Sequence, residues 1–294
     1  MRRKNYFCGM IGFNLNKTKR HFMEVLLAKF PYRETEQLMR ILLEDLFSID
    51  QKQQLMEPDL RIDELQYSIL NDAVNQLMEG VPVQYVTGKA WFDGLLFYVD
   101  ESVLIPRPET EELVQKAAQG LPDDKPLRIW DVGTGSGCIA IALAKRFPLA
   151  EVTAFDVSEK ALVTAQRNAS SNEVSVNFVC DDVLHPQSDF WLQPVDLVIS
   201  NPPYVRESEK ALMERNVLDH EPHSALFVPD EDPLLFYRQI FHLAKPQLQP
   251  DGVVWFEINE ALGEEMTILC QEMGFRGGAL EDYHGKRRFF TAVF

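Results

Sequence analysis

The spacing of apolar residues predicts helices in the first part of the chain, over residues 21–80. Residues 38–46 carry apolar side chains three and four positions apart, and only Asp45 interrupts the apolar face. A second face with this spacing is formed by Leu65, Ile69, Ala73 and Leu77. Gly80 and Pro82 follow it and are a typical helix stop. We therefore expect a small helical domain over residues 21–80.

Residues 81–104 have a different pattern, rich in aromatic and branched side chains. Three β-prone runs lie at residues 84–86, 91–92 and 95–99, and Asp93-Gly94 separates the last two. Asp-Gly between such runs is a strong signal for a two-residue hairpin turn. We expect residues 81–104 to form a linking β-hairpin.

Short apolar runs alternate with helical patterns from about residue 127 onward. The runs that read as strands are residues 128–132, 151–156, 176–180, 195–200, 253–258 and 287–294. Residues 138–146, 158–169, 234–244 and 261–273 read as helices. Alternation of this kind predicts a doubly wound, mostly parallel α/β sheet with helices on both faces. We assign residues 105–294 to this Rossmann-like domain.

Charge and composition narrow the range of partners. The 294 residues include 29 basic and 45 acidic ones, which gives a formal net charge of −16. Because such a surface repels phosphate backbones, we expect no stable nucleic-acid binding. No apolar run approaches the roughly 18 residues that cross a membrane, so we expect no membrane association. The only closely spaced histidines, His220 and His223, flank Pro222 and do not predict a metal site.

The chain begins with basic residues and no acids over residues 1–20. Its apolar part is weak for a signal peptide, so we expect a disordered extension. A targeting segment and a start codon placed too early are the alternatives. The four cysteines lie far apart without a Cys-x-x-Cys pair, as expected for free thiols in a cytoplasmic protein.

A glycine-rich turn, Asp-Val-Gly-Thr-Gly-Ser-Gly, joins the first predicted strand of the sheet to its helix. Its glycines let the backbone bend tightly and approach a ligand beside the positive end of the helix. We predict that the cofactor contacts Gly133, Thr134, Gly135, Ser136 and Gly137. The run from Gly135 to Ala140 also fits the dinucleotide pattern Gly-x-Gly-x-x-Ala, so an NAD-dependent oxidoreductase stays open at this point.

Two acidic residues follow the next strands. Asp156 ends the second strand, 23 residues after Gly133, where a carboxylate accepts both hydroxyls of a ribose. NAD and S-adenosylmethionine both carry such a ribose, so Asp156 does not choose between them. Asp182 follows the third strand, where it can meet the exocyclic amine of an adenine, and Val183 can pack on the base.

The fourth strand ends in Asn201-Pro202-Pro203-Tyr204, and this turn decides between the cofactors. Neither proline can continue the sheet ladder, so a rigid turn with free carbonyls remains. The Asn201 side-chain oxygen and the Pro202 carbonyl can each accept one N–H of a planar NH2 group, while Tyr204 stacks on that group. Such a turn positions a nitrogen for methyl transfer. A hydride-transfer enzyme has no evident use for it.

Together these motifs resemble the class I S-adenosylmethionine-dependent methyltransferases that act on amino groups. Residues 82–88 and 91–94 narrow the resemblance, and above all residues 104–111, Leu-Ile-Pro-Arg-Pro-Glu-Thr-Glu, are similar to the peptide chain release factor glutamine methyltransferases, the PrmC/HemK family. The resemblance covers roughly residues 25–294. One departure is Asn259, because the family pattern has a glycine after Glu-Ile.

The resemblance implies a seven-stranded sheet and methylation of the glutamine amide in the Gly-Gly-Gln motif of release factors. S-adenosylmethionine would lie on residues 133–137, Asp156, Asp182, Val183 and Asn201, and the glutamine on residues 201–204. The helical front domain would help to hold the release factor. A nucleic-acid amino-methyltransferase, which flips a base into the same pocket, is the main alternative, and the acidic charge stands against it. An NAD-dependent oxidoreductase and a non-catalytic binding protein are the remaining ones.

Overall fold

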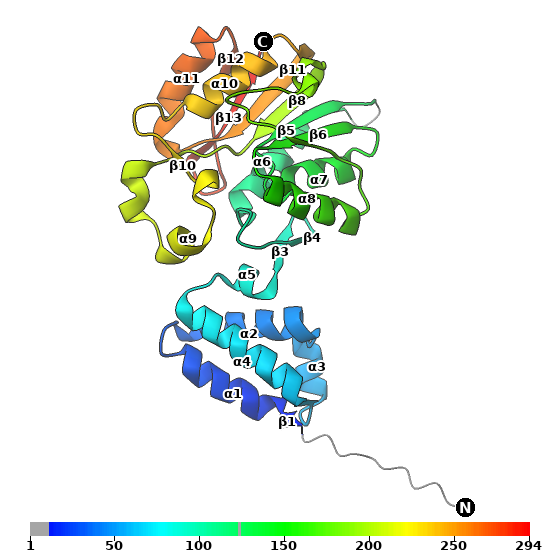
Figure 1. Ribbon diagram of the computed structural model, residues 1–294, viewed down its shortest axis with the longest axis vertical. Helices are drawn as coiled ribbons and strands as arrows, with labels where there is room; N and C mark the ends of the chain where they lie inside the picture. The colour runs from blue at the N-terminus through cyan, green and yellow to red at the C-terminus, as the bar shows by residue number, and fades with distance from the viewer. Residues whose placement is uncertain (1–11, 123–124) are drawn as a thin grey trace, which may run out of the picture. The chain divides into compact units, whose positions relative to one another are not determined.

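The computed structural model describes residues 12–122 and 125–294, and the chain divides between Gly88 and Lys89 into two compact units (Figure 1). The predicted boundary at residue 20 is wrong. Strand β1 (Phe13–Asn14) and helix α1 (Leu15–Leu26) already belong to the first unit. The Asn14 side chain caps α1 by accepting a hydrogen bond from the Lys17 N–H, which accounts for a helix start inside the basic stretch. Residues 1–11 lie outside the described residues.

The first unit is a helical bundle, as expected. Its elements after α1 are α2 (Tyr32–Phe47), α3 (Gln51–Met56), β2 (Arg61–Ile62), α4 (Glu64–Glu79) and α5 (Val83–Thr87). In α4 the buried face consists of Leu70, Ala73, Val74 and Leu77. The predicted face was therefore rotated, because Leu65 and Ile69 are exposed and the true face has the spacing i, i+3, i+4, i+7.

Residues 83–87 form helix α5, so the β-prone assignment of residues 84–86 is wrong. Pro82 precedes this helix and Gly88, at φ +69°, ends it. These two residues impose a helical turn that outweighs the β propensity of the short run between them. The hairpin itself is confirmed as β3 (Lys89–Phe92) and β4 (Leu95–Tyr98), joined at Asp93-Gly94 with both φ angles positive.

The second unit contains a seven-stranded sheet in the order β12-β13-β11-β8-β5-β6-β7. The strands are β5 (Arg128–Val132), β6 (Glu151–Asp156), β7 (Asn177–Cys180), β8 (Val195–Ser200), β11 (Leu248–Glu257), β12 (Arg276–Glu281) and β13 (Arg287–Val293). Within this sheet the β11–β13 and β12–β13 pairs are antiparallel, and the other pairs are parallel. The mostly parallel sheet is thus confirmed. Strand β12 escaped prediction because Gly277 and Gly278 leave it without an apolar run.

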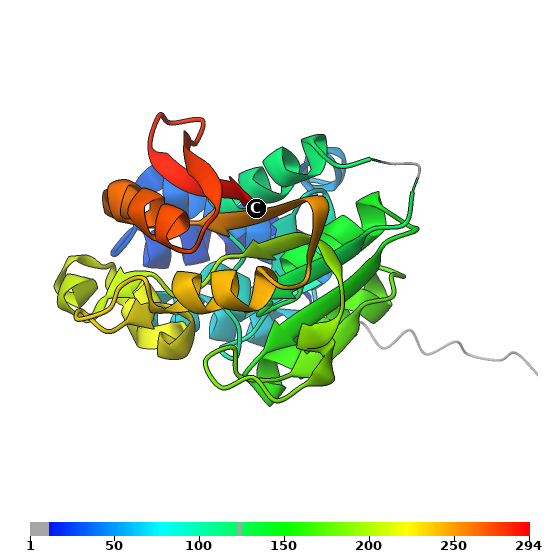
Figure 2. The ribbon, with the colours of Figure 1, turned by 90° about the horizontal axis from the view of Figure 1, so that it is seen from above.

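Helices cover both faces of the sheet (Figure 2). Helices α6 (Pro108–Gln119), α7 (Cys138–Arg146) and α8 (Glu159–Ser171) pack on one face, and α10 (Leu235–Ala244) and α11 (Gly263–Glu272) pack on the other. Successive strand residues serve the two cores in turn: Ile129 packs in the first and Trp130 in the second. Phe92 and Phe97 bring the hairpin into the first core.

The segment between β8 and α10 holds short elements that the sequence pattern did not predict. They are β9 (Val205–Arg206), α9 (Arg215–His220) and β10 (Phe227–Val228), with short 3-10 turns between them. None of the helices within residues 12–122 and 125–294 combines the length and hydropathy needed to cross a membrane.

Candidate active site

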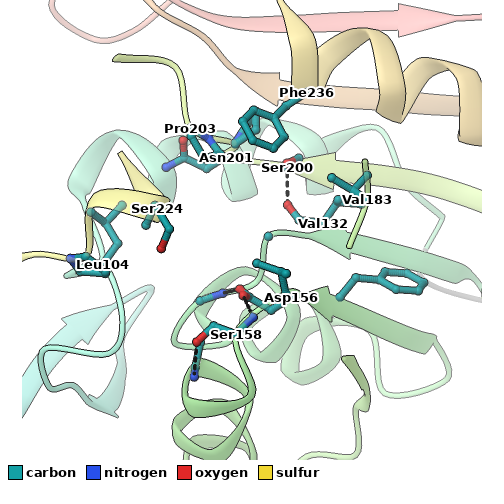
Figure 3. Close-up of a pocket in the computed structure, with 18 of the residues that line it drawn as sticks. Leu104, Val132, Asp156, Ser158, Val183, Ser200, Asn201, Pro203, Ser224 and Phe236 are labelled. Carbon is teal, nitrogen blue, oxygen red and sulfur yellow. Dashed lines mark hydrogen bonds between the residues drawn. The ribbon is translucent and has the colours of Figure 1, made fainter. Parts of the chain in front are cut away.

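A cavity of about 400 Å³ lies at the carboxyl ends of β5, β6, β7 and β8 (Figure 3). This edge of an open parallel sheet is where ligands bind, and the volume suits a small-molecule site. The predicted site residues that line the cavity are Gly133, Gly135, Asp156, Asp182, Val183, Asn201, Pro202 and Pro203. The four strand ends identified from the sequence therefore do meet at one place.

Four predicted site residues, Thr134, Ser136, Gly137 and Tyr204, are not among those that line this cavity. The Thr134 hydroxyl points back into the loop and donates to Asp131 Oδ2 over 2.6 Å. At Gly137, φ is +82°, and a Cβ would lie 2.9 Å from Ile141 and 3.1 Å from Ala165. These positions shape the loop from behind. By contrast, a Cβ built at Gly133 or Gly135 meets no atom within 4 Å, so the loop presents bare backbone to open space.

Asp131 anchors the glycine loop from inside the protein. Its Oδ2 accepts hydrogen bonds from the Thr134 hydroxyl and, over 3.1 Å, from the Ala140 N–H. Its Oδ1 is buried and has no partner among the described residues. Burial raises the pKa of Asp131 to about 7, although both hydrogen bonds act in the opposite direction. This carboxyl thus ties the end of β5 to the first turn of α7.

Asp156 joins the glycine loop to the start of α8. Its Oδ2 accepts from the Gly135 N–H over 2.8 Å, and its Oδ1 accepts from the Ser158 N–H over 2.9 Å. Burial raises the pKa of Asp156, and these N–H groups oppose the rise. A carboxylate has about four lone-pair sites, so both oxygens retain capacity for the hydroxyls of a ligand.

Two neighbouring acids shape the loop after β7. Asp181 accepts hydrogen bonds from the backbone of Gln187 and Ser188 and from Trp191 Nε1, and so folds the loop onto itself. Asp182 is half-buried: its Oδ1 accepts from the Leu184 N–H and its Oδ2 lies 2.9 Å from His185 Nδ1. Both acids line the cavity. The sequence pattern singled out Asp182 alone, since an adjacent acid has no distinguishing signal.

The Asn-Pro-Pro-Tyr turn is held by side chains from distant segments. Asn201 Nδ2 donates to Thr110 Oγ1 over 3.0 Å, and the Thr110 hydroxyl donates to Glu257 Oε2 over 2.7 Å. The Tyr204 hydroxyl donates to Glu257 Oε1 over 2.9 Å. Burial and the Glu257 carboxylate raise the pKa of Tyr204 well above its ordinary value, so this hydroxyl stays protonated. The ring of Tyr204 packs against the second core.

Other lining residues escaped the sequence reasoning, among them Leu104, Ser224 and Phe236 (Figure 3). Leu104 precedes a loop whose Ile105 N–H and Arg107 guanidinium both bind the Glu221 carboxylate. Glu221 is buried and adjoins Pro222, which also lines the cavity. The pair thus holds two lining segments together. Arg107 lies in the run of residues 104–111 that carries the family resemblance, whereas Glu221 is only a charged residue beside a proline, which is common on surfaces.

One amide side chain connects the hairpin to the glycine loop. Asn168 on α8 accepts the Tyr98 N–H over 2.7 Å and donates to the Tyr98 carbonyl over 2.9 Å. It also donates to the Ser136 carbonyl over 2.9 Å. The side chain is buried, so these hydrogen bonds are shielded from water.

Asn259, where the family pattern has glycine, does not distort the strand end. Its φ of −63° suits any residue. Its Oδ1 caps the following 3-10 turn at the Ala261 N–H, and its Nδ2 donates to Glu209. The departure from the pattern is therefore accommodated locally.

Fold and cavity together define a class I S-adenosylmethionine-dependent methyltransferase. The family models that match are the methyltransferase small domain over residues 113–222 and the PrmC N-terminal domain over residues 22–88. A methyltransferase structure from Pyrococcus furiosus superposes with a TM-score of 0.50 at 18% identity, over 68% of this chain and 89% of that one. This likeness concerns the fold.

Closer relatives identify the family. The release factor glutamine methyltransferase of Flavobacterium psychrophilum is 44% identical over 277 residues, which cover 93% of this chain and 96% of that protein. The Bacteroides thetaiotaomicron enzyme of this name is 40% identical over 279 residues, 95% of this chain and 99% of that one. The chain belongs to the release factor glutamine methyltransferase family. The predicted family, enzyme class and S-adenosylmethionine cofactor are thus confirmed.

Proposed function

We propose that the cavity binds S-adenosylmethionine and that the protein methylates the side-chain amide nitrogen of the glutamine in the Gly-Gly-Gln motif of release factors. The bare backbone of Gly133 and Gly135 leaves room for close approach of the methionine part. Asp156 is suited to the ribose hydroxyls, and Asp182 and Val183 to the adenine. When bound, S-adenosylmethionine supplies a methyl group on a sulfonium centre.

The observation that carries this proposal is the hydrogen bonding of Asn201. Its Nδ2 is committed to Thr110, so Oδ1 is the atom left to accept a hydrogen bond in the cavity. Oδ1 and the Pro202 carbonyl would each accept one N–H of the target amide. Because an amide lone pair is delocalised, two such acceptors orient the nitrogen and favour its loss of conjugation. Tyr204 does not line the cavity, so in place of stacking on the planar group it would hold the turn through its hydrogen bond to Glu257.

We further propose that the helical unit docks the release factor, since it matches the PrmC N-terminal domain. Hydrogen exchange with and without release factor would test this: protection is expected within residues 12–88. Unchanged exchange there in a saturated complex contradicts it. No stable nucleic-acid binding belongs to this proposal, given the charge of −16, and we place the reaction in the cytoplasm, where release factors act.

The activity test mixes the protein, S-adenosylmethionine and a recombinant release factor, and follows the factor by mass spectrometry. We expect one added methyl on the motif glutamine. A release factor with this glutamine replaced is the control and should stay unmodified. Methylation of the control, or of nucleic acid in its place, contradicts the proposed substrate.

A further inference from the structure

Glu257 lies buried beneath the Asn-Pro-Pro-Tyr turn and has no role in the transfer as described above. The residue is 2% exposed and ends β11. Its two oxygens accept hydrogen bonds from the hydroxyls of Thr110 and Tyr204, and its backbone carbonyl accepts one from Tyr237 over 3.0 Å. A buried acid with each oxygen bound to a different segment is costly to keep unless it fixes something.

The direction of these hydrogen bonds determines how the Asn201 amide is turned. A carboxylate only accepts, so the single proton of the Thr110 hydroxyl is spent on Glu257. Toward Asn201, the Thr110 oxygen can therefore only accept, and the Asn201 atom 3.0 Å away must be the NH2 group. The amide oxygen then faces the other way, and Asn201 lines the cavity.

We infer that Glu257 and Thr110 are positioning residues, which hold the Asn201 amide with its oxygen toward the target glutamine. The inference rests on the proposed function and deepens it. A reversed amide would present its NH2 to the NH2 of the substrate, and two donors cannot pair. The direction of donation along these hydrogen bonds, from amide to hydroxyl to carboxylate, therefore matters in addition to the shape of the site.

The hydrogen bonds of Glu257 are those of an ionised carboxylate, because each of its oxygens accepts from a hydroxyl group. Burial raises the pKa of Glu257 above its ordinary value, although the hydrogen bonds from Thr110 and Tyr204 and the charge of Arg288 on β13 oppose the rise. Glu109 in α6 acts in the opposite direction to Arg288. Tyr237 contributes a neutral hydroxyl to the backbone carbonyl alone.

The first test is Glu257→Gln, which keeps the shape and changes the polarity. With glutamine at this position, the hydroxyls of Tyr204 and Thr110 both keep an acceptor in only one arrangement. The glutamine oxygen accepts from Tyr204, and the glutamine NH2 donates to Thr110. Thr110 then donates toward Asn201 and turns its amide around. We expect kcat to fall on the order of 10²-fold, as for loss of an aligned catalytic dipole. S-adenosylhomocysteine affinity should stay within about threefold, because the glycine loop, Asp156 and Asp182 are unaltered.

Two further variants separate polarity from structural damage. Thr110→Val interrupts the series of hydrogen bonds from Asn201 to Glu257 and should lower kcat similarly. Thr110→Ser, which restores the hydroxyl, should recover most of the loss. Tyr237→Phe is the matched control: it removes a buried hydrogen bond to the same residue without touching the path to Asn201. It should lower the melting temperature and leave kcat near that of the parent protein.

The sharpest test combines Glu257→Gln with Asn201→Asp, which reverses the direction of donation along the whole series of hydrogen bonds. The introduced glutamine would then donate to the Thr110 hydroxyl, and this hydroxyl would donate to the introduced aspartate, whose second oxygen would face the substrate as an acceptor. We expect this double variant to exceed Glu257→Gln in kcat by roughly tenfold, as one recovered hydrogen bond allows. A double variant no better than Glu257→Gln, or a Glu257→Gln variant with parental kcat, overturns the inference. Failure of the unaltered protein to methylate release factor would instead overturn the proposed function.

Discussion

Asp156 and Asn201 both line the cavity, yet different kinds of contact hold them in place. Asp156 is fixed by backbone N–H groups of Gly135 and Ser158, which lie within 21 residues of it. Asn201 is fixed by Thr110, 91 residues away, and through it by Glu257, which lies 147 residues from Thr110 along the chain. The cofactor half of the cavity, formed by the glycine loop and Asp156, therefore depends on local backbone geometry. The substrate half, formed by the turn at Asn201, depends on side chains that only the complete fold brings together.

The largest effect is expected for Asn201→Ala, which removes the acceptor from the substrate half. Turnover should fall on the order of 10³-fold, as when one preorganised group is lost from a transition state. Cofactor affinity should stay largely intact, because Asp156 and the glycine loop are untouched. Single-turnover kinetics and calorimetric titration with S-adenosylhomocysteine measure the two effects. Near-parental turnover would remove the basis for the proposed chemistry.

Asp131, beneath the cofactor half, makes the free energy of unfolding of the protein depend on pH. Its pKa of about 7 in the folded state lies above the ordinary 3.8. The folded protein therefore holds a proton that the unfolded chain releases, and this favours folding below about pH 4 and is lost as the pH rises to about 7. Such a shift corresponds to roughly 4 kcal/mol across the window.

Asp131→Asn should flatten this dependence. The free energy of unfolding, from urea denaturation at several pH values, should fall less between pH 4 and 7 in the variant than in the parent. Other acids contribute equally to both proteins and cancel in the difference. Parallel curves for the two proteins would contradict a raised pKa at this position.

Asp156→Ala should separate the two halves in the opposite sense to Asn201→Ala. It removes a carboxylate that holds Gly135 and would bind the ribose, so affinity for S-adenosylhomocysteine should fall by about 10²-fold, typical of two lost charged hydrogen bonds. At saturating cofactor, turnover should recover to within about tenfold of the parent, since Asn201 keeps its partners. Loss of turnover without loss of affinity would assign Asp156 to the substrate half.

The smallest effect is expected for Asp182→Ala. This side chain is half-buried: the hydrogen bond it accepts from the Leu184 N–H is partly buried, and its contact with His185 is exposed. Cofactor affinity should fall by about tenfold or less, as one partly solvated hydrogen bond allows. Asp181→Ala gives the comparison: by unfolding the loop around Trp191 it should also lower the melting temperature, whereas Asp182→Ala should not.

How far the sequence predicts the molecule follows the same division. The alternation of strands and helices depends on neighbours in the chain and was confirmed, and the glycine loop and Asp156 lie at the strand ends where the pattern put them. Thr110 had a signal in the run of residues 104–111, but its role requires Glu257, an acid that merely ends an apolar strand. Strand β12 forms because it pairs with β13, although its own residues predict no strand. Exposed Leu65 in α4 shows how two apolar stripes on one helix leave the buried face undecided until the bundle forms.

The three hydrogen bonds of Asn168 have a practical consequence for anyone who builds chimeras between relatives. They make the hairpin part of the cofactor loop's scaffold, because Tyr98 and Ser136 share this one amide. The helical unit can therefore be exchanged cleanly only by cutting between Gly88 and Lys89, ahead of the hairpin. A junction placed after Tyr98 would import a foreign strand against Asn168. Such a junction would loosen the glycine loop even in a chimera that keeps every cofactor-contacting residue.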